Sequence, residues 1–566
     1  MKAQKQVNNG KVWLNKETRP YRASIILLTC LTVIATLASL TFAYLVSYVI
    51  NSADDGNAQM VWIFSGILLG LVLLKILLKT FDSYYAEKLR TRLTSNLRTR
   101  TFAKILRSDY AKISAYHSGD LVNRLTTDIH EVSADTVGLM PALVGMSVQC
   151  VGSIIALLTI EPLFTAIYVV CGGAFAGIAV LFRRQIKKRQ QEVLRADGEH
   201  RAFMQETLSS VMTIKAYGAE GKSEVKCSDF AQKYYDKRMR RNQVRTGMNG
   251  IFALLSNAGL IFAVIWCGIS MLYGNNKDFG AILSIVLLLM QFQQPLTGFS
   301  SVIPAYYSRL ASGERLAEID ELPTEEVLPE SQTTLSYDKL QSLVFDKLSF
   351  TYGRDIVLSD ISAQIHKEDV VCLLGSSGSG KSTLFKLLLN IFTPTSGDIL
   401  LTDHEGNTYP LTAKERGLFA YVPQGNFLFS GTIYENLTFF SNEKEEGILK
   451  EKVHSAIQTA CADFVHELPD GLQTVLSERG AGLSEGQLQR LAIARAILSD
   501  RPILLFDEAT SALDNATEEQ LLKNIKSLTG KTCLIVTHRP AALAIADKVF
   551  SLTDGKLQIK DKNELN

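Results

Sequence analysis

The sequence predicts a multidomain membrane protein, with an all-α transmembrane domain of six helices followed by an α/β domain that carries a phosphate-binding loop. Three observations predict this fold class. Long apolar runs without charged residues occupy the chain before residue 310, strand-like and helical runs alternate after residue 343, and the stretch GSSGSGKST lies between a strand-like and a helical run. The 566 residues are also too many for one hydrophobic core.

Six stretches of the first part are apolar enough to cross a bilayer, since a helix needs about 20 apolar residues to span the hydrocarbon core. Buried helices of a soluble protein rarely stay free of charge over such lengths, and the first run is too long for a cleaved signal peptide. The charge-free runs are 23–50, 136–160, 162–182, 246–276 and 279–308, and a shorter run, 60–74, continues past Lys75 to Leu78. We therefore expect six spans.

Loop charge orients these spans. Lysine and arginine are concentrated before the first span, between the second and third, and between the fourth and fifth. The opposite connections, NSADDGNAQ, the residues around Glu161 and GNNKDFG, contain one lysine among them. By the positive-inside rule both termini and both long connections are cytoplasmic, and the expected location is a bacterial-type plasma (inner) membrane.

The two long cytoplasmic connections have helical periodicity, as in YAEKLRTRLTSNLRTRTFAKIL and FMQETLSSVMTIKAYGAEGKSEV. We interpret them as spans that continue into the cytoplasm as helices and turn back, so that two hairpin tips are able to dock on a cytoplasmic partner. The net charge of only +2 argues against a protein that binds nucleic acid through bulk electrostatics.

The character of the chain changes after the last apolar run. The stretch ERLAEIDELPTEEVLPESQ is acidic and contains Pro323 and Pro329, which is typical of a linker. We predict a transmembrane domain over 1–310, a linker over 311–342 and an α/β domain over 343–566. In the last domain VVCLLG, LFAYVPQ, PILLFDE and TCLIVTH are strand-like and alternate with helical segments.

The stretch VVCLLGSSGSGKSTLFKLLL has the strand–loop–helix pattern of a nucleotide-binding phosphate loop. Its glycines let backbone N–H groups turn toward phosphate oxygens, and the helix N-terminus adds its dipole. Lys381 is placed to reach the β- and γ-phosphates, and the Ser382 hydroxyl to ligate Mg²⁺. The predicted phosphate-binding set is Gly375, Ser376, Ser377, Gly378, Ser379, Gly380, Lys381, Ser382 and Thr383.

An acidic pair lies in the stretch PILLFDEAT. Four apolar residues bring Asp507 and Glu508 to the end of a buried strand, where two carboxylates are costly unless they are used. Asp507 suits the Mg²⁺ shell, and Glu508 suits the orientation or deprotonation of an attacking water. A helix cap would explain an isolated pair, but a phosphate loop in the same domain favours catalysis.

Six short motifs occur in an order that resembles the ABC superfamily, specifically exporter-type half-transporters. They are SFTYG, the phosphate loop, YVPQ, SERGAGLSEGQ, LLFDEATSALD and VTHRP. The resemblance covers almost the whole chain, including the six spans and the cytoplasmic segment SGDLVNRLTTDIHEV. It implies a transmembrane domain of the ABC exporter type followed by a P-loop ATPase domain, with ATP and Mg²⁺ as cofactors.

The resemblance also implies roles for single residues. Tyr352 would stack on adenine, and Asp514 would signal between ATP sites. Gln424 would sense Mg²⁺ and the γ-phosphate, and His538 would hold the γ-phosphate and the attacking water. The implied catalytic set is Glu508, His538 and Gln424, and the implied metal set is Ser382, Gln424 and Asp507.

The stretch GLSEGQ is a second glycine-containing turn before a helix, and the family explains it. In ABC proteins this signature closes over ATP held by the phosphate loop of the partner, so Ser484, Gly486 and Gln487 would act on a second half-transporter. The chain would then work as a homodimer or heterodimer with two composite sites. The stretch SERG resembles the exporters' coupling motif, a link to the hairpin tips.

The implied function is ATP-driven export of a peptide, lipid or hydrophobic small molecule across the lipid bilayer. The six spans exclude a soluble ABC ATPase of DNA repair or translation. The alternative is an exporter-fold siderophore importer, or a thiol exporter that serves respiratory-chain assembly.

The sixth span carries a stripe of small and polar residues at helical spacing. Glutamine is expensive in hydrocarbon, so this stripe should face protein or a water-filled cavity. Helix packing would suit it as well as a substrate path does, and the resemblance favours the path. The stripe consists of Gln291, Gln294, Gly298, Ser301 and Ala305.

Overall fold

The computed structural model describes residues 2–273, 279–325, 335–425, 428–477 and 482–560. Its contacts divide the chain into two compact units. The helical unit is Met1–Phe102 with Gly119–Asp320, and the α/β unit is Ala103–Ser118 with Glu321–Asn566. A short piece of the first part of the chain therefore belongs to the α/β unit.

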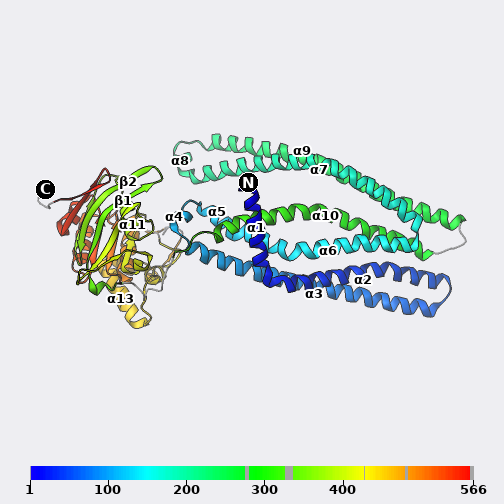
Figure 1. The fold of residues 1–566 in the computed structure, drawn as a ribbon, viewed down its shortest axis with the longest axis horizontal. Helices are drawn as coiled ribbons and strands as arrows, with labels where there is room; N and C mark the ends of the chain where they lie inside the picture. The colour runs from blue at the N-terminus through cyan, green and yellow to red at the C-terminus, as the bar shows by residue number, and fades with distance from the viewer. Residues whose placement is uncertain (1, 274–278, 326–334, 426–427, 478–481, 561–566) are drawn as a thin grey trace. The chain divides into compact units, whose positions relative to one another are not determined.

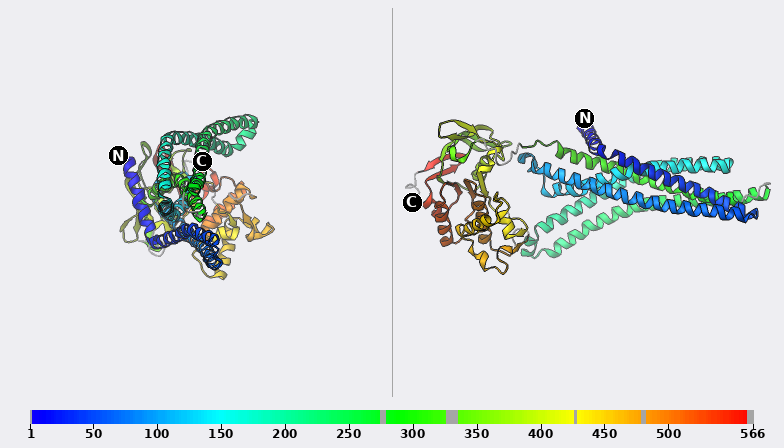
Figure 2. Two further views of the ribbon diagram at one scale, coloured as in Figure 1. Left: turned by 90° about the vertical axis from the view of Figure 1, so that its right-hand side faces the viewer. Right: turned by 90° about the horizontal axis from the view of Figure 1, so that it is seen from below.

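Six long helices contain the predicted spans, the fifth span as far as Tyr273, where the described residues of that segment end. They are α2 (Arg22–Asp54), α3 (Ala58–Leu106), α6 (Ile129–Ile160), α7 (Pro162–Ser209), α9 (Glu220–Tyr273) and α10 (Phe279–Asp320). Shorter elements are α1 (Lys2–Thr18), η1 (Arg19–Tyr21), α5 (Ser118–Asn123), the π-helical η2 (Arg124–Asp128) and α8 (Val211–Ala216). Figures 1 and 2 show α7 and α9 side by side, joined through α8.

By length and composition, three of the described helical segments are able to cross a membrane: Asn9–Asp54, Ala58–Leu106 and Ser118–Ile160. Shorter apolar stretches lie at Asn257–Ile269 and Phe279–Pro295. The 54 residues of α9 correspond to about 80 Å of helix, far more than the hydrocarbon core of about 30 Å. The long helices thus continue beyond their apolar runs, as predicted for two projecting hairpins.

Aromatic side chains pack two of these helices together. Phe164 of α7 is fully buried, and its ring lies 5.5 Å from that of Phe262 and 6.2 Å from that of Trp266 on α9. The large contact area of such rings compensates for the absence of a hydrophobic driving force between helices in lipid.

Two residues of the stripe on the sixth span contact neighbouring helices. Gln291 Nε2 donates to the Ser39 carbonyl of α2 at 2.9 Å, and a Cβ on Gly298 would lie 2.6 Å from Met146 Cε of α6. These contacts agree with the helix-packing alternative. The side chain of Ser301 lies outside the described residues, and the substrate path stays a prediction.

Ion pairs join the segment SGDLVNRLTTDIHEV to the end of α10. Arg124 is buried and pairs with Asp120 at 2.9 Å and with Glu318 at 3.0 Å. Asp128, which has no exposed surface, pairs with Arg315. This segment therefore ties α5, η2 and α6 to α10 through charges that lie outside the predicted spans.

The α/β unit contains two main sheets. The larger has the order β12-β11-β3-β10-β9-β6, in which all neighbours except β12 and β11 pair in parallel, and the smaller is the antiparallel sheet β2-β1-β4-β5. The strands are β1 (Leu340–Tyr352), β2 (Asp355–His366), β3 (Val370–Leu374), β4 (Ser396–Asp403), β5 (Thr408–Pro410), β6 (Phe419–Val422), β7 (Gly431–Thr432), β8 (Val475–Leu476), β9 (Ile503–Asp507), β10 (Thr532–Val536), β11 (Lys548–Thr553) and β12 (Lys556–Lys560).

Seven described helices belong to the α/β unit. They are α4 (Tyr110–Ile113), α11 (Lys381–Leu388), α12 (Ile433–Thr438), α13 (Glu446–Thr459), α14 (Glu485–Leu498), α15 (Asn515–Lys526) and α16 (Pro540–Ile545). The short 3₁₀ turns are η4 (Tyr337–Lys339), η5 (Ala413–Leu418), η6 (Asp463–Glu467) and η7 (Gly471–Gln473). Strands β9 and β10 are buried at every position, which is typical of parallel strands covered on both faces.

Candidate nucleotide-binding site

Four neighbouring parallel strands end at the same edge of the larger sheet. In the order β3-β10-β9-β6, the phosphate loop follows β3, His538 follows β10, Asp507 ends β9, and Gln424 follows β6. Val536 at the end of β10 pairs with Asp507, so the ends of these two strands are level. Ligands of such sheets bind outside the carboxyl ends of the strands, which is where the predicted residues gather.

The phosphate loop turns through a left-handed glycine into α11. Gly380 caps the helix with φ +104°, a conformation that a residue with a Cβ rarely adopts. The buried Lys381 lies back across the loop, where Nζ donates to the carbonyl of Gly375 at 2.6 Å and of Ser376 at 2.9 Å. The lysine ammonium is thus held beside the backbone that would surround phosphate.

The other residues of the loop and of the first turn of α11 differ in exposure. Ser376, Ser377 and Gly378 are exposed, whereas Thr383 is buried in the first turn of α11. Ser382 is half-buried in the same turn.

The acidic pair and Gln424 meet at the end of β9. Asp507 is 3% exposed and accepts a hydrogen bond from the Tyr421 hydroxyl at 3.2 Å. Glu508 has the unusual φ of +52°, and its Oε2 accepts from Gln424 Nε2 at 2.9 Å. The structure therefore brings together three of the predicted metal and catalytic residues, while His538 is exposed at the end of the adjacent strand.

Tyr421 is a residue of this site that the sequence analysis missed. It lies in the quoted motif YVPQ, but only the order of β6 beside β9 places its hydroxyl next to Asp507. Burial, and after it the charge of Asp507, raises the pKa of Tyr421. Its hydroxyl therefore stays protonated at neutral pH and remains a donor to the carboxylate.

Tyr352 belongs to a different part of the α/β unit, at the end of β1 in the antiparallel sheet. It is 42% exposed, and its ring meets Phe350 and Phe392 edge-on at centroid distances of 4.9 and 5.5 Å. Two aromatic rings thus hold the tyrosine at an angle that leaves part of its surface open to a flat ligand.

The signature residues form a capping box at the start of α14. Ser484 Oγ accepts from the Gln487 N–H at 3.3 Å, and the Ser484 N–H donates to Gln487 Oε1 at 2.8 Å. A Cβ on Gly486 would lie 2.8 Å from the Ala512 carbonyl oxygen, so glycine permits this close approach. Of the SERG element, Ser477 is described, whereas residues 478–480 lie outside the described residues.

Asp514 caps α15 and accepts the Thr517 N–H at 3.0 Å. Backbone and side-chain hydrogen bonds from Thr517 lower the pKa of Asp514. Arg539, a further residue missed from the sequence, supports the segment before Asp514 by donating to the carbonyls of Ser511 (2.6 Å) and Leu513 (2.7 Å). Arg539 directly follows His538 in the quoted motif VTHRP, but its contact with these carbonyls depends on the position of β10 beside β9, which the sequence does not show.

The residues at this edge of the sheet fit a nucleoside triphosphate. Ser379 Oγ is buried in the loop and has no hydrogen-bond partner among the described residues, so a phosphate oxygen would satisfy it. The described part of the chain holds no group of three acidic, histidine or cysteine ligands. One carboxylate from Asp507 and one hydroxyl from Ser382 nevertheless suit Mg²⁺, which takes few protein ligands and completes its shell with phosphates and water.

A membrane-spanning helical domain fused to a nucleotide-binding α/β domain defines an ATP-driven membrane transporter. Residues 25–296 match the family model described as the ABC transporter transmembrane region, and residues 358–511 match the model described as ABC transporter. The chain belongs to the ABC transporter family, in the half-transporter arrangement that the sequence predicted.

Known proteins resemble the chain over most of its length. It is 30% identical over 527 residues to an uncharacterized ABC transporter ATP-binding protein of Bacillus subtilis, covering 89% of this chain and 87% of that protein. It is 27% identical to the ATP-dependent lipid A-core flippase of Albidiferax ferrireducens, covering 95% and 92%. A bacterial Atm1-family ABC exporter with ATP bound has the same fold, with TM-score 0.78, 24% identity and coverage of 97% and 96%.

These matches confirm the predicted fold class, a helical transmembrane domain followed by an α/β ATP-binding domain. They also confirm an ATPase-driven ABC transporter whose chain crosses the membrane several times.

Replacing Tyr421 by phenylalanine should destabilise the α/β unit. The variant removes the hydroxyl donor from a carboxylate that is 3% exposed, and a buried acceptor left without its donor costs about 1–3 kcal/mol. Chemical denaturation of the detergent-solubilised protein, followed by a probe in the α/β unit, would measure the loss.

Tyr409→Phe is the matched control for Tyr421→Phe. Tyr409 also donates to a buried carboxylate, that of Asp403, but this carboxylate keeps donors from Glu405 and Asn407. The control should lose less stability. Equal losses in both variants would contradict a special dependence of Asp507 on Tyr421.

Proposed function

We propose that two half-transporters of this kind enclose two composite ATP sites and export a peptide, a lipid or a hydrophobic small molecule across the inner membrane. One observation supports the dimer: the α/β unit contains two elements suited to phosphate, the loop before α11 and the start of α14. The described side-chain hydrogen bonds of Ser484 and Gln487 run between these two residues. A second nucleotide, held by a partner, gives the start of α14 a ligand.

The substrate class rests on the helical unit and on a relative. A relative that covers nearly the whole chain is named as a lipid A-core flippase. The predicted spans contain no acidic residue, which argues against a proton-coupled exporter and against an acidic trap for organic cations. In this proposal 1–310 is the transmembrane domain, 311–342 the linker and 343–566 the ATP-binding domain, with both termini cytoplasmic, and α10 continues into the linker as far as Asp320.

In the proposed site each residue has a distinct task. Ser382, Gln424 and Asp507 would hold Mg²⁺, which when bound neutralises charge on the phosphates. Lys381 would exchange the carbonyls of Gly375 and Ser376 for phosphate oxygens, and Tyr352 would stack on adenine.

Hydrolysis would depend on the end of β9. Glu508 would take the proton of the attacking water, and the Gln424 amide, which donates to it at 2.9 Å, fixes the direction of that carboxylate. His538 would hold the water against the γ-phosphate. Ser484, Gly486 and Gln487 would act from the partner half-transporter, and Asp514 would signal between the two ATP sites.

Replacing Glu508 by glutamine should preserve ATP binding and reduce turnover by about 10²-fold or more, because the amide cannot accept the proton. Nucleotide binding and phosphate release by the purified protein would measure both. Glu519→Gln, which changes an exposed carboxylate on α15, is the control and should hydrolyse ATP normally. Near-normal hydrolysis by Glu508→Gln would refute the assigned role.

Mixed dimers test the composite sites. Lys381→Ala and Ser484→Arg copies should each be inactive alone, because each change affects both sites of its own dimer. A dimer with one copy of each contains one site with both defects and one intact site, and should recover partial activity. Purification through two different affinity tags would isolate it; a stable and fully active monomer would disprove shared sites.

Transport direction separates the proposal from the alternative of a siderophore importer. In inside-out vesicles an exporter should accumulate its substrate when ATP is added outside, whereas an importer should not. A panel of labelled phospholipid, hydrophobic dye, peptide, thiol and ferric siderophore would also distinguish a lipid or peptide exporter from a thiol exporter. ATP-dependent loss of preloaded siderophore from these vesicles would favour the importer.

A further inference from the structure

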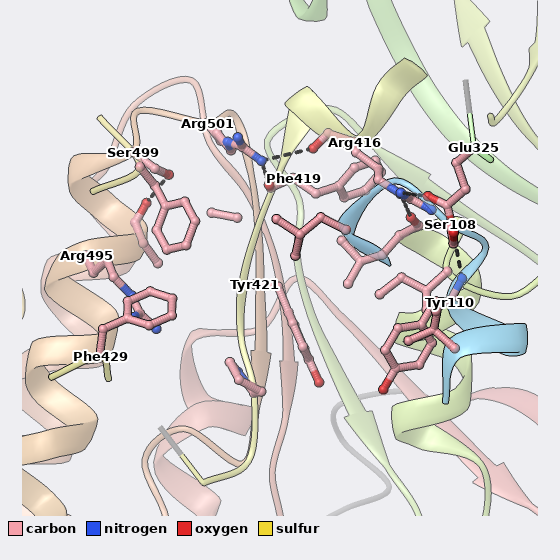
Figure 3. A pocket seen from close by; sticks show the side chains of 18 of the residues that line it. Ser108, Tyr110, Glu325, Arg416, Phe419, Tyr421, Phe429, Arg495, Ser499 and Arg501 are labelled. Atoms are coloured by element: carbon pink, nitrogen blue, oxygen red, sulfur yellow. Dashed lines mark hydrogen bonds and ion pairs between the residues drawn. The ribbon is translucent and has the colours of Figure 1, made fainter. Parts of the chain in front are cut away.

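The tip of the first hairpin is built into the α/β unit beside a hollow of about 590 Å³. Figure 3 shows this hollow, with Ser108 and Tyr110 from the tip at one end, close to Glu325 and Arg416. Glu325 belongs to the predicted linker, which the sequence analysis regarded only as a connection. The contacts of Glu325 indicate a more specific role.

The linker is paired with the tip through its backbone. Thr324 forms an antiparallel bridge with Ser108. The Asp109 N–H donates to the Pro323 carbonyl at 3.0 Å, and the Glu325 N–H donates to the Arg107 carbonyl at 2.8 Å. The short segment Pro323–Glu325 therefore lies along the tip in a fixed register, which places the side chain of Glu325.

The carboxylate of Glu325 has two partners on different parts of the unit. Oε1 accepts the N–H of Tyr110, the first residue of α4, at 3.2 Å, and Oε2 pairs with the guanidinium of Arg416. The side chains of Glu325 and Arg416 are 18% and 27% exposed, so solvent screens this pair less than a surface pair. We call Glu325 and Arg416 the linker latch.

Arg416 continues the connection to the phosphate-loop helix. Its Nε donates to the Leu389 carbonyl at 2.7 Å, and its Nη2 donates to the Asn390 carbonyl at 2.5 Å. These carbonyls directly follow α11, and the last carbonyls of a helix lack partners within the helix. The first residue of α11 is Lys381, so the eight-residue helix joins the phosphate loop to the linker latch over about 12 Å.

An aromatic contact between Phe392 and Tyr110 is a second link between the hairpin tip and the segment after α11. The ring of Phe392, two residues beyond Asn390, lies 6.0 Å from Tyr110 and 5.5 Å from Tyr352. The hairpin tip thus contacts the continuation of α11 at two points, one charged and one aromatic.

We propose that the linker latch transmits movement of the phosphate-loop helix to the first hairpin tip, and so to α3, when nucleotide binds. Glu325 and Arg416 are positioning residues: their contacts described above are with the tip, with each other and with the carbonyls after α11, and they act by holding the tip to the end of α11. The proposal rests on the proposed function, since a movement needs a nucleotide-driven cycle to transmit. Without the latch, ATP should still bind, but the membrane helices should respond to it poorly.

Two variants and one control test the latch in the full-length protein. Glu325→Ala removes both contacts of the carboxylate, and Glu325→Gln keeps an acceptor for the Tyr110 N–H but loses the ion pair, which provides a milder change if the alanine variant folds poorly. Asp338→Ala, which removes an exposed acid of the same predicted linker, is the control.

The first readout is amide hydrogen exchange in the tip, which needs no transport activity. The amides of Asp109 and Tyr110 should exchange about tenfold faster in Glu325→Ala than in the parent or in Asp338→Ala. Unchanged exchange would overturn the latch while leaving the proposed function intact.

The second readout is the response of the membrane helices to nucleotide. A spin label at Ala58→Cys, an exposed position at the start of α3, in a protein whose eight native cysteines are replaced, reports the distance between the two copies. ATP with vanadate should shift this distance in the parent and in Asp338→Ala. In Glu325→Ala the shift should fall by roughly half or more although ATP binds with similar affinity.

The outcomes separate the latch from the proposed function. A full shift in Glu325→Ala overturns the latch. If no distance between copies can be measured in the parent protein, the proposed dimer is contradicted. If ATP with vanadate does not shift the distance in the parent, the proposed nucleotide-driven cycle is contradicted.

Discussion

The parallel pairing of β3, β10, β9 and β6 is the constraint on which the α/β unit depends. Because parallel strands are buried on both faces, they need runs such as VVCLL and TCLIV, and because they run the same way, their carboxyl ends meet at one edge. Asp507 is buried at that edge, where Tyr421 of the neighbouring strand reaches its carboxylate. A one-residue slip of β6 against β9 would turn the tyrosine to the opposite face of the sheet and leave the carboxylate without this donor.

A different constraint governs the helical unit. In hydrocarbon every backbone N–H and C=O must be satisfied within the segment, so the spans are continuous helices. Beyond the apolar runs, charged side chains fix helices to one another, since buried Arg124 and Asp128 pair with residues at the end of α10. Within the spans, described polar contacts also join helices, such as Gln291 on the Ser39 carbonyl and Ser284 on the Ala43 carbonyl.

The sequence was sufficient for features that depend on local order. The apolar runs predicted six helices, and the strand–loop–helix pattern around Lys381 predicted the phosphate loop. Asp507 was recognised because burying a carboxylate at the end of an apolar strand costs free energy unless the carboxylate has a partner or a function. The sequence analysis did not recognise Tyr421, Arg539 and Glu325. Each contacts a residue distant in sequence, and nothing in the local sequence around each of them indicates that contact. Only the sheet order, or the pairing of Thr324 with Ser108, brings them to their partners.

The start of α14 shows how one structure can serve both the fold and the proposed dimer. In the capping box, the Ser484 oxygen accepts the Gln487 N–H, which satisfies one of the donors that a helix leaves open at its N-terminus. A hydroxyl has one donor besides its two acceptor positions, so this bond leaves the Ser484 O–H available to donate. The remaining N–H groups of the first turn and the helix dipole favour an anion at the same place. The cap therefore holds Ser484 in a fixed direction and leaves its O–H free to rotate toward a ligand, which is the arrangement that a phosphate bound by a partner half-transporter would require.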